Sequence, residues 1–446
     1  MLIKGWKGLS LLLAVSLMLA ACAPAATPAP TAQPTAVPQP TTAPQPTEAP
    51  QATEAPKPTE VPPTAAPQPT ETPTAAPVAW VSQSSGKKSA SGFDCPEPQP
   101  KMDVKSTTLN LFVWTQYIPQ DILDCFEAVY GIKINHDEYS GNEEMYAKVS
   151  KGSTNYDILQ PSADYIEPLV RQNIIQKLDK SKLSIMGYYA PQYLNLPYDP
   201  GNEYTVPYEF GTDAVVYNSD KVSVAPTSWA DLWKPEYKDL PMVLLDSSHD
   251  IIGATLISLG YDPNTSDPKQ LAEAKAKLAE LVPSVKLFDS DSPKTALIAG
   301  DVVLGITWTG DAFISSQKVP AIKYVYPKEG PILWQDNYVI PASAPHLDAA
   351  YAWLNYSMQP DLFWLMLRDF QYTNPNQAAL DYAKGNQMPI KDVDGNDTTP
   401  DKLYQAYIGS PITSTPPDVI KSGHFLKDLG NAAPAYEKIW TEVKGK

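Results

Sequence analysis

Strand-like and helix-like segments alternate along the chain after Thr107, and this alternation constrains the fold more than any other feature. A first series predicts a strand, helix, strand, helix and strand in the segments TLNLFVW, IPQDILDCFEAVYG, IKINHDEY, NEEMYAKVS and YDILQ. A second series has strands at its ends and helices between them, in PMVLLD, IIGATLISLG, KQLAEAKAKLAELV and DVVLGITW. This order is typical of an open α/β sheet, in which ligands bind beyond the carboxyl ends of the strands.

Aromatic and acidic residues gather at these strand ends. They follow the predicted strands in VWTQY, LQPSADY, LLDSSHD and ITWTGD. A further predicted strand, ILWQDNYVIP, places Trp334, Asp336 and Tyr338 at alternate positions and therefore on one face. A carboxylate between two aromatic side chains is costly to bury unless a positive group meets it. The pattern predicts an aromatic and acidic pocket.

The chemistry of this predicted pocket suits an organic cation. Indole and phenol faces attract cations and cover methylene chains, while carboxylates accept charge-assisted hydrogen bonds from ammonium groups. A linear polyamine offers both features in alternation, and a quaternary amine or a cationic amino acid offers a shorter version. The pattern alone leaves these three classes of ligand open.

The first 21 residues are typical of a secretory signal peptide. Lys4 and Lys7 precede an apolar run from Leu9 to Ala21, which is shorter than the roughly 20 residues of a membrane-spanning helix. Leu19, Ala20 and Ala21 before Cys22 resemble a bacterial lipobox. We therefore expect Cys22 to be lipidated and to anchor an extracytoplasmic protein to the cell membrane. An ordinary signal peptide with an incidental cysteine is the alternative.

A region rich in proline and threonine follows the predicted lipidation site. From residue 23 to about residue 78 the chain consists almost entirely of Pro, Thr, Ala, Gln and Glu. Such a composition has too little apolar surface to form a core, and its prolines favour extended polyproline II. We expect residues 22–100 to form a lipidated, disordered stalk.

The other two cysteines, Cys95 and Cys125, suggest a disulfide. An exported chain encounters an oxidising environment, and with Cys22 assigned to lipid these two remain as one pair. Their bridge would tie the segment after the stalk to the first predicted helix. Two unpaired thiols are the alternative.

Charge and motifs argue against several classes of protein. The chain has 50 acidic and 34 basic residues, a formal net charge of −16, which disfavours nucleic-acid binding. It contains no nucleophile elbow, zinc-protease pair or phosphate-binding loop, so we expect no catalysis, cofactor or metal. The histidines are scattered and are expected to be surface or packing residues: His136, His249, His346 and His424. Glu143 and Glu144 suit the first turn of a helix.

Several sequence blocks, taken in order, resemble a known family. They are FVWTQYIP, SGNEEMYAKV, YDILQPS, KLDKSKL, TSWADLWKPEYK, GITWTGDAF, YPKEGPILWQDN and YTNPNQAA. The chain from about Leu109 to its C-terminus resembles the spermidine/putrescine-binding lipoproteins of bacterial ABC importers, within the type II periplasmic binding proteins.

The resemblance implies a two-lobed α/β fold with open sheets, helices on both faces and hinge crossovers between the lobes. Residues 101–211 and 336–380 would form the first lobe, and residues 212–335 and 381–446 the second. The lobes would close over a polyamine, and the closed form would present it to the permease subunits of an ABC transporter. A monomer is expected.

The resemblance also implies which residues bind the ligand. Asp336 aligns with the central amine-binding carboxylate, Asp250 with an acid that binds a terminal amine, and Trp308 and Trp334 with tryptophans that sandwich the methylene chain. The full predicted set is Trp114, Thr115, Gln116, Tyr117, Ser162, Asp164, Asp246, Asp250, Ser290, Trp308, Trp334, Asp336 and Tyr372. Tyr338 has no ligand role in the family and is expected to be a packing residue.

Four positions depart from the family pattern. Gln116 replaces a common acid, Ser247 stands beside Asp246 where paired acids occur, and Leu426 replaces an amide. Asp164 takes a position that is often aromatic and would restore a negative charge. These changes leave the preferred ligand length open. Asp311 suits the first turn of a helix and is left out of the predicted site.

The sequence therefore predicts a solute-binding lipoprotein that captures a linear polyamine without chemistry. A receptor for a quaternary amine or a basic amino acid is the alternative among binding proteins. A secreted hydrolase is the alternative from another class, although no pair of acids in the sequence identifies an active site.

Overall fold

The computed structural model describes residues 80–152 and 154–445. All of these residues belong to one compact unit. The predicted signal peptide, the lipidation site at Cys22 and most of the predicted stalk lie outside the described residues. No helix in the described part of the chain is both long and apolar enough to cross a membrane.

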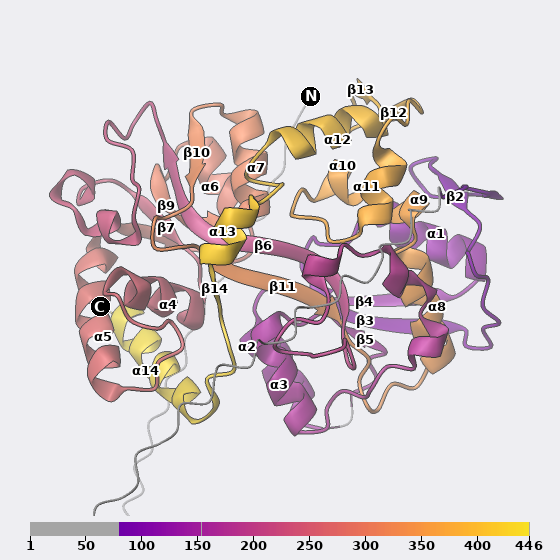
Figure 1. Ribbon diagram of the computed structural model, residues 1–446, viewed down its shortest axis with the longest axis horizontal. Coiled ribbons are helices and arrows are strands. Elements are labelled where there is room, and N and C mark those ends of the chain that lie inside the picture. Colours follow the sequence, from indigo (N-terminus) through magenta and orange to yellow (C-terminus); the bar gives the residue numbers. More distant parts are fainter. Residues whose placement is uncertain (1–79, 153, 446) are drawn as a thin grey trace, which may run out of the picture. The chain divides into compact units, whose positions relative to one another are not determined.

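A parallel sheet of three strands, in the order β4-β3-β5, lies at the centre of the first lobe (Figure 1). Its strands are β3 (Thr108–Trp114), β4 (Lys133–Tyr139) and β5 (Ile158–Leu159). Leu109, Leu111 and Val113 face a core that includes α1 (Gln120–Tyr130) and α8 (Leu347–Ser357). Phe112 faces the opposite way, toward α2 (Asn142–Val149) and α3 (Ala163–Arg171). Helices therefore cover both faces, as an apolar parallel sheet requires.

The second lobe contains a mixed sheet of seven strands. Its main order is β14-β11-β6-β9-β7-β8, and β10 pairs with the end of β6. Five of its strands lie in this lobe alone: β7 (Met242–Leu244), β8 (Val285–Phe288), β9 (Leu304–Trp308), β10 (Ile322–Val325) and β14 (His424–Phe425). Its helices are α4 (Ser248–Ser258), α5 (Pro268–Leu281), α6 (Pro293–Ala299), α7 (Thr309–Lys318) and α14 (Ala433–Lys444).

Two antiparallel strands run from one lobe into the other (Figure 1). In β6 (Val206–Asn218), Tyr208 packs in the core of the first lobe and Val215 in the core of the second. In β11 (Ile332–Tyr338), Ile332 lies in the second core and Tyr338 in the first. The predicted two-lobed α/β fold with crossover strands is confirmed. The sequence did not identify β6, the longest of these strands.

Short elements complete the described chain. The remaining α-helices are α9 (Pro360–Phe363), α10 (Met366–Asp369), α11 (Gln377–Ala383), α12 (Pro400–Gly409) and α13 (Pro417–Ser422), and a small hairpin consists of β12 (Ile390–Lys391) and β13 (Asp397–Thr398). Tyr407 of α12 is buried in the core of the first lobe. This packing differs from the predicted boundary at residue 380. We propose that the chain returns to the second lobe only after α12.

The predicted disulfide between Cys95 and Cys125 is present, with 5.2 Å between the Cα atoms. It joins α1 to a hairpin of β1 (Ser84–Lys88) and β2 (Asp94–Pro96). The folded part therefore begins before residue 101, and the predicted stalk extends too far toward the C-terminus. The physical reason is that this bridge, together with strand pairing, holds a segment that has little apolar surface of its own.

Candidate functional site

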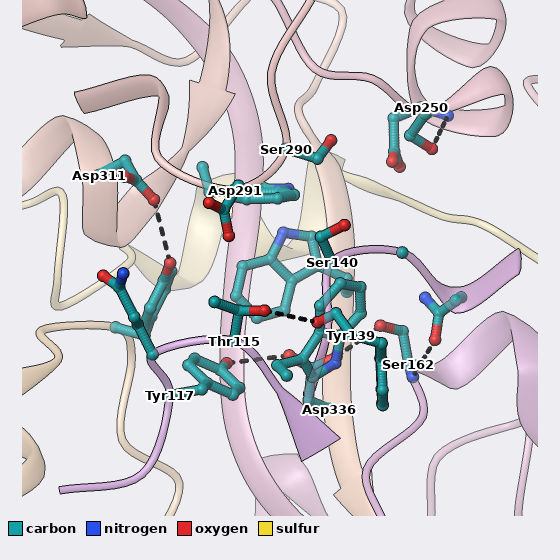
Figure 2. Close-up of a pocket in the computed structure, with 18 of the residues that line it drawn as sticks. Thr115, Tyr117, Tyr139, Ser140, Ser162, Asp250, Ser290, Asp291, Asp311 and Asp336 are labelled. Atoms are coloured by element: carbon teal, nitrogen blue, oxygen red, sulfur yellow. Dashed lines mark hydrogen bonds between the residues drawn. The ribbon is translucent and has the colours of Figure 1, made fainter. Parts of the chain in front are cut away.

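A pocket of about 300 Å³ lies between the two lobes, beyond the carboxyl ends of β3, β5 and β9. Its lining includes every residue of the predicted ligand-binding set, from Trp114 in the first lobe to Trp308 in the second. In Figure 2, Thr115, Tyr117 and Ser162 come from elements of the first lobe, and Asp250 and Asp311 from the second. The pocket thus depends on both lobes.

Asp336 lies at the base of this pocket on β11 and is only 5% exposed. The Tyr117 hydroxyl donates a hydrogen bond of 2.9 Å to Oδ2, and Ser162 Oγ donates one of 2.5 Å to Oδ1 (Figure 2). Burial raises the pKa of Asp336 to about 7, although the two hydroxyl groups oppose that shift. No ion pair among residues 80–152 and 154–445 includes Asp336. This carboxyl group is oriented by donors but lacks a counter-charge.

The loop after β3 is fixed by backbone contacts. Thr115 donates from its backbone N–H and its hydroxyl to the carbonyl oxygen of Tyr139, at 3.0 and 3.2 Å. Gln116 has a φ of 50°, in the left-handed region, and its backbone N–H donates to Glu138. This tight turn directs Tyr117 toward Asp336. Gln116 lines the pocket, at a position where the resemblance described above implies an acid.

Trp334 forms an aromatic wall next to Asp336. Its Nε1–H donates to Asp213 Oδ1 at 2.9 Å, and its ring meets Tyr372 edge-on with 5.4 Å between centroids. A Cβ atom at Gly211 would lie 2.2 Å from Cζ2 of Trp334, so only glycine leaves room for the indole ring. A Cβ atom at Gly310 would lie 2.5 Å from the Tyr372 ring. Two glycines therefore permit the aromatic wall.

Tyr338 is a packing residue, as predicted. It is fully buried in the core of the first lobe, with its ring centroid 4.7 Å from that of Tyr208. Tyr208 in turn packs against Tyr117 at 5.2 Å. Tyr208 and Tyr117 thus separate Tyr338 from the pocket, although Tyr338 alternates with Asp336 along the strand.

Several acidic side chains form another part of the lining. Asp164 at the start of α3 lies 3.5 Å from Nδ1 of His249 on α4, so this pair connects the two lobes. His249 is buried and its ring packs against Tyr436, as expected of a packing residue, and the same side chain also lines the pocket. Glu143 lies in the first turn of α2, as predicted, but it also lines the pocket. Burial and the nearby Asp250 raise the pKa of Glu143 to about 7, and burial also raises that of Asp250.

Asp311 belongs to the pocket, contrary to the sequence-based assignment. It does lie in the first turn of α7, but its carboxylate is buried and accepts hydrogen bonds from Lys294 at 3.0 Å and from the Tyr372 hydroxyl at 3.2 Å. The helix-turn role was correct, but the sequence could not show that the same carboxylate faces the pocket. Unlike Asp336, it already has a basic partner.

Two further acids in β6 were missed by sequence reasoning. Asp213 is fully buried, and burial together with Asp250 raises its pKa well above the usual value. Glu209 is paired in register with Asp336, and neither of its carboxylate oxygens has a hydrogen-bond partner in the described structure. Burial strongly raises its pKa. A recognisable signal existed, because two acids four residues apart interrupt the otherwise apolar and aromatic run PYEFGTDAVVY.

The outer lining contains the remaining predicted residues. Asp246 accepts hydrogen bonds from Lys444 and from Nε1 of Trp440 at 3.1 Å. Ser290 Oγ is buried and has no hydrogen-bond partner within the described residues. Leu426 lines the pocket with an apolar side chain, at a position where the resemblance implies an amide. No group of three or more potential metal ligands occurs in the part of the chain that the structure describes.

Comparisons with known proteins match this part of the chain. The family model described as bacterial extracellular solute-binding protein matches residues 121–392. The spermidine/putrescine-binding periplasmic protein of Escherichia coli (strain K12) is 36% identical over 342 residues, covering 76% of this chain and 92% of that protein. Two solved structures are similar to this one. The spermidine/putrescine ABC transporter substrate-binding protein of Streptococcus pneumoniae has a TM-score of 0.62 and a sequence identity of 31%, and a lipoprotein of Treponema pallidum has a TM-score of 0.62 and a sequence identity of 25%. These structures cover 76% of this chain and 99% and 100% of their own.

Proposed function

The chain belongs to the family of bacterial extracellular solute-binding proteins, and we propose that it captures a linear polyamine and delivers it to the permease of an ABC transporter. One observation carries this proposal. Asp336 is buried, is held by two hydroxyl donors and lacks a basic partner in the described structure, and aromatic rings stand beside it. An ammonium group supplies the missing charge, and the rings cover the methylene chain attached to it.

The number of unpaired acids favours a ligand with more than one positive charge. Glu143, Asp250 and Asp336 line the same pocket, and none of them takes part in an ion pair within the described residues. A quaternary amine with one charge would leave at least two of these carboxyl groups without a partner, which is costly in a partly desolvated site. A polyamine distributes its charges along a flexible chain and so suits all three.

The two tryptophans and the central acid have distinct proposed roles. Asp336 binds an ammonium group, Trp334 and Trp308 pack on the methylene groups, and Asp250 binds a terminal amine with Asp164 and Glu143 nearby. The remaining predicted residues shape the pocket from its lining. Closure of the lobes excludes water and so strengthens each contact between an ammonium and a carboxylate. We propose no chemical step on the ligand.

We further propose that the protein is a monomer held at the outer face of the cell membrane by a lipid on Cys22. The E. coli relative is a periplasmic protein, and the Treponema pallidum relative is a lipoprotein. Residues 23–78 would then act as a polyproline-rich spacer between the membrane and the binding lobes. Replacing Cys22 by Ser should release the protein from the membrane fraction, and unchanged membrane association would contradict this anchor.

Calorimetry tests the proposed ligand. The chain from residue 23 onward would be titrated with putrescine, cadaverine, spermidine and spermine, and with choline and arginine as representatives of the other cation classes. We expect stoichiometric binding of at least one linear polyamine, with weaker binding of choline and arginine and with no turnover. Absence of binding to all four polyamines would overturn the proposal, and conversion of a ligand to products would favour the hydrolase.

A further inference from the structure

A second cavity of about 420 Å³ adjoins the candidate site. The two cavities share part of their lining and are therefore neighbours along the cleft; the shared residues are Ser140, Gly141, Glu143, Asp246, Ser290 and Asp291. The outer cavity adds two aromatic side chains, Phe288 and Trp440, and the only basic residue in its described lining, Lys444. It therefore has the same aromatic and acidic character as the inner site.

Lys444 places its ammonium group in a corner formed by two aromatic rings. The rings of Phe288 and Trp440 meet at 90° with 5.3 Å between centroids, and Lys444 Nζ lies 5.3 Å from each of them. The same ammonium group donates to Asp246 Oδ1, which also accepts the hydrogen bond from Trp440 Nε1. Two ring faces and a carboxylate thus surround one alkylammonium group of the protein itself.

This arrangement reproduces the chemistry by which the inner site would hold its ligand. The side chain of lysine is a 4-aminobutyl group, which is putrescine without one of its two amines. Lys444 lies in the last turn of α14 and its side chain is 31% exposed, so the ammonium group can leave the corner without unfolding the helix. The same cavity is also lined by Glu144, Asp289 and Glu437, whose carboxylates could accept a displaced lysine or an incoming amine.

We propose that the corner of Phe288, Trp440 and Asp246 is a second ammonium subsite, and that Lys444 occupies it as a tethered competitor that limits the length of the bound polyamine. This inference rests on the proposed function of the inner site. A diamine fits the inner pocket without meeting Lys444. A longer polyamine reaches the outer cavity and must displace the lysine to place another ammonium group on Asp246.

The variant Lys444→Met tests this inference, since methionine keeps much of the side-chain length and removes the charge. We expect its Kd for spermine to fall about fivefold to tenfold, the range for a cation held by an aromatic face and a carboxylate, while its Kd for putrescine changes less than about twofold. Lys438→Met is the matched control. Lys438 is an exposed residue of the same helix, so its loss changes the net charge equally but leaves the corner unchanged.

Three further results are decisive. Adding Asp246→Asn to the Lys444→Met variant should abolish the gain for spermine, because the subsite then lacks its carboxylate. Equal gains for putrescine and spermine, or equal effects of the two lysine variants, would overturn the inference even if the wild-type chain binds polyamines. A wild-type chain that binds no polyamine would instead overturn the proposed function. Thermal unfolding of each variant shows that the fold is intact.

Discussion

Ser162 immediately precedes α3 but donates its hydroxyl to Asp336 Oδ1 instead of capping its own helix. A serine at this position usually accepts a hydrogen bond from the backbone of the first turn. Here the side chain makes no capping hydrogen bond and instead orients the carboxyl group that we assign to the ligand. The first-lobe helix and the crossover strand are therefore connected at the centre of the site.

Replacing Ser162 by Ala should weaken ligand binding with little effect on stability. A hydrogen bond to a charged group contributes about 1.5 to 3 kcal/mol, so Kd should rise roughly tenfold to a hundredfold. Thr399→Ala is the contrasting variant, because Thr399 does cap its helix by accepting from the Lys402 backbone N–H at 3.2 Å. It should lower the free energy of unfolding by about 1 kcal/mol and leave Kd unchanged. A Ser162→Ala variant that loses stability but keeps its Kd, or a Thr399→Ala variant that loses affinity but keeps its stability, would contradict this account.

Ligand binding should depend on pH near neutrality. Burial raises the pKa of Asp336 and of Glu143 to about 7 in the unliganded protein, so both groups are partly protonated at pH 7. A bound ammonium favours the charged carboxylates and therefore releases protons. Affinity should rise between pH 6 and pH 8 and then level off. Calorimetry in two buffers with different ionisation enthalpies measures the released protons, and pH-independent affinity without proton release would contradict the prediction.

The raised pKa of Asp336 should make the unliganded protein less stable as the pH rises, whereas it makes the affinity for the ligand higher. The folded pKa of Asp336 lies above its ordinary value of 3.8, so the folded state holds this proton more tightly than the unfolded state. The contribution of Asp336 to the free energy of unfolding is therefore present below about pH 4 and is lost as the pH rises toward 7.

Gly211 should be required for ligand affinity although it is not part of the predicted ligand-binding set. A Cβ atom there would lie 2.2 Å from Trp334 Cζ2, so Gly211→Ala must displace the indole ring. We expect Kd to rise about tenfold, consistent with the loss of an aromatic contact to a cation and its methylene groups. Gly187→Ala is a suitable control, because a Cβ atom at Gly187 meets no atom within 4 Å. Equal affinities of the two variants would argue against a role for Trp334.

The disulfide should stabilise the fold without affecting the ligand. Cys95 and Cys125 are separated by 30 residues, and closing a loop of that size is worth about 3 to 4 kcal/mol in the chain-entropy model. Neither cysteine lines the pocket. Replacing both by Ser should therefore lower the free energy of unfolding by up to that amount, measured by denaturant titration, while Kd stays within about twofold. A large change in Kd would show that the hairpin influences the site.

Local signals in the sequence predicted much of the fold and of the pocket. Short stretches of sequence were enough to predict three features. These are the apolar alternation of TLNLFVW, the end of α1 at Gly131 with a φ of 69°, and the acids at the strand ends. The position of Asp336 between aromatic residues was recognisable because a strand repeats every two residues. The resemblance to a known family then assigned roles that no local pattern specifies.

Contacts between distant segments were the part that the sequence did not reveal. Asp311 met the local rule for a helix start, but its contacts with Lys294 and Tyr372 depend on how three segments pack. The pairing of Lys444 with Asp246 spans 198 positions and has no local signature. Burial of Glu209 and Asp213 follows from the central place of β6, which their charges made difficult to recognise as a strand.

The substitution Asp336→Asn tests the central claim most directly. It keeps the shape of the side chain but removes the negative charge that would meet an ammonium group. We expect calorimetry with the polyamine that binds the wild-type chain to show a loss of about 2 to 4 kcal/mol, or roughly thirtyfold to a thousandfold in Kd. The same change at the exposed Asp103 should leave Kd unchanged. Equal affinity of Asp336→Asn and the wild-type chain would contradict the account.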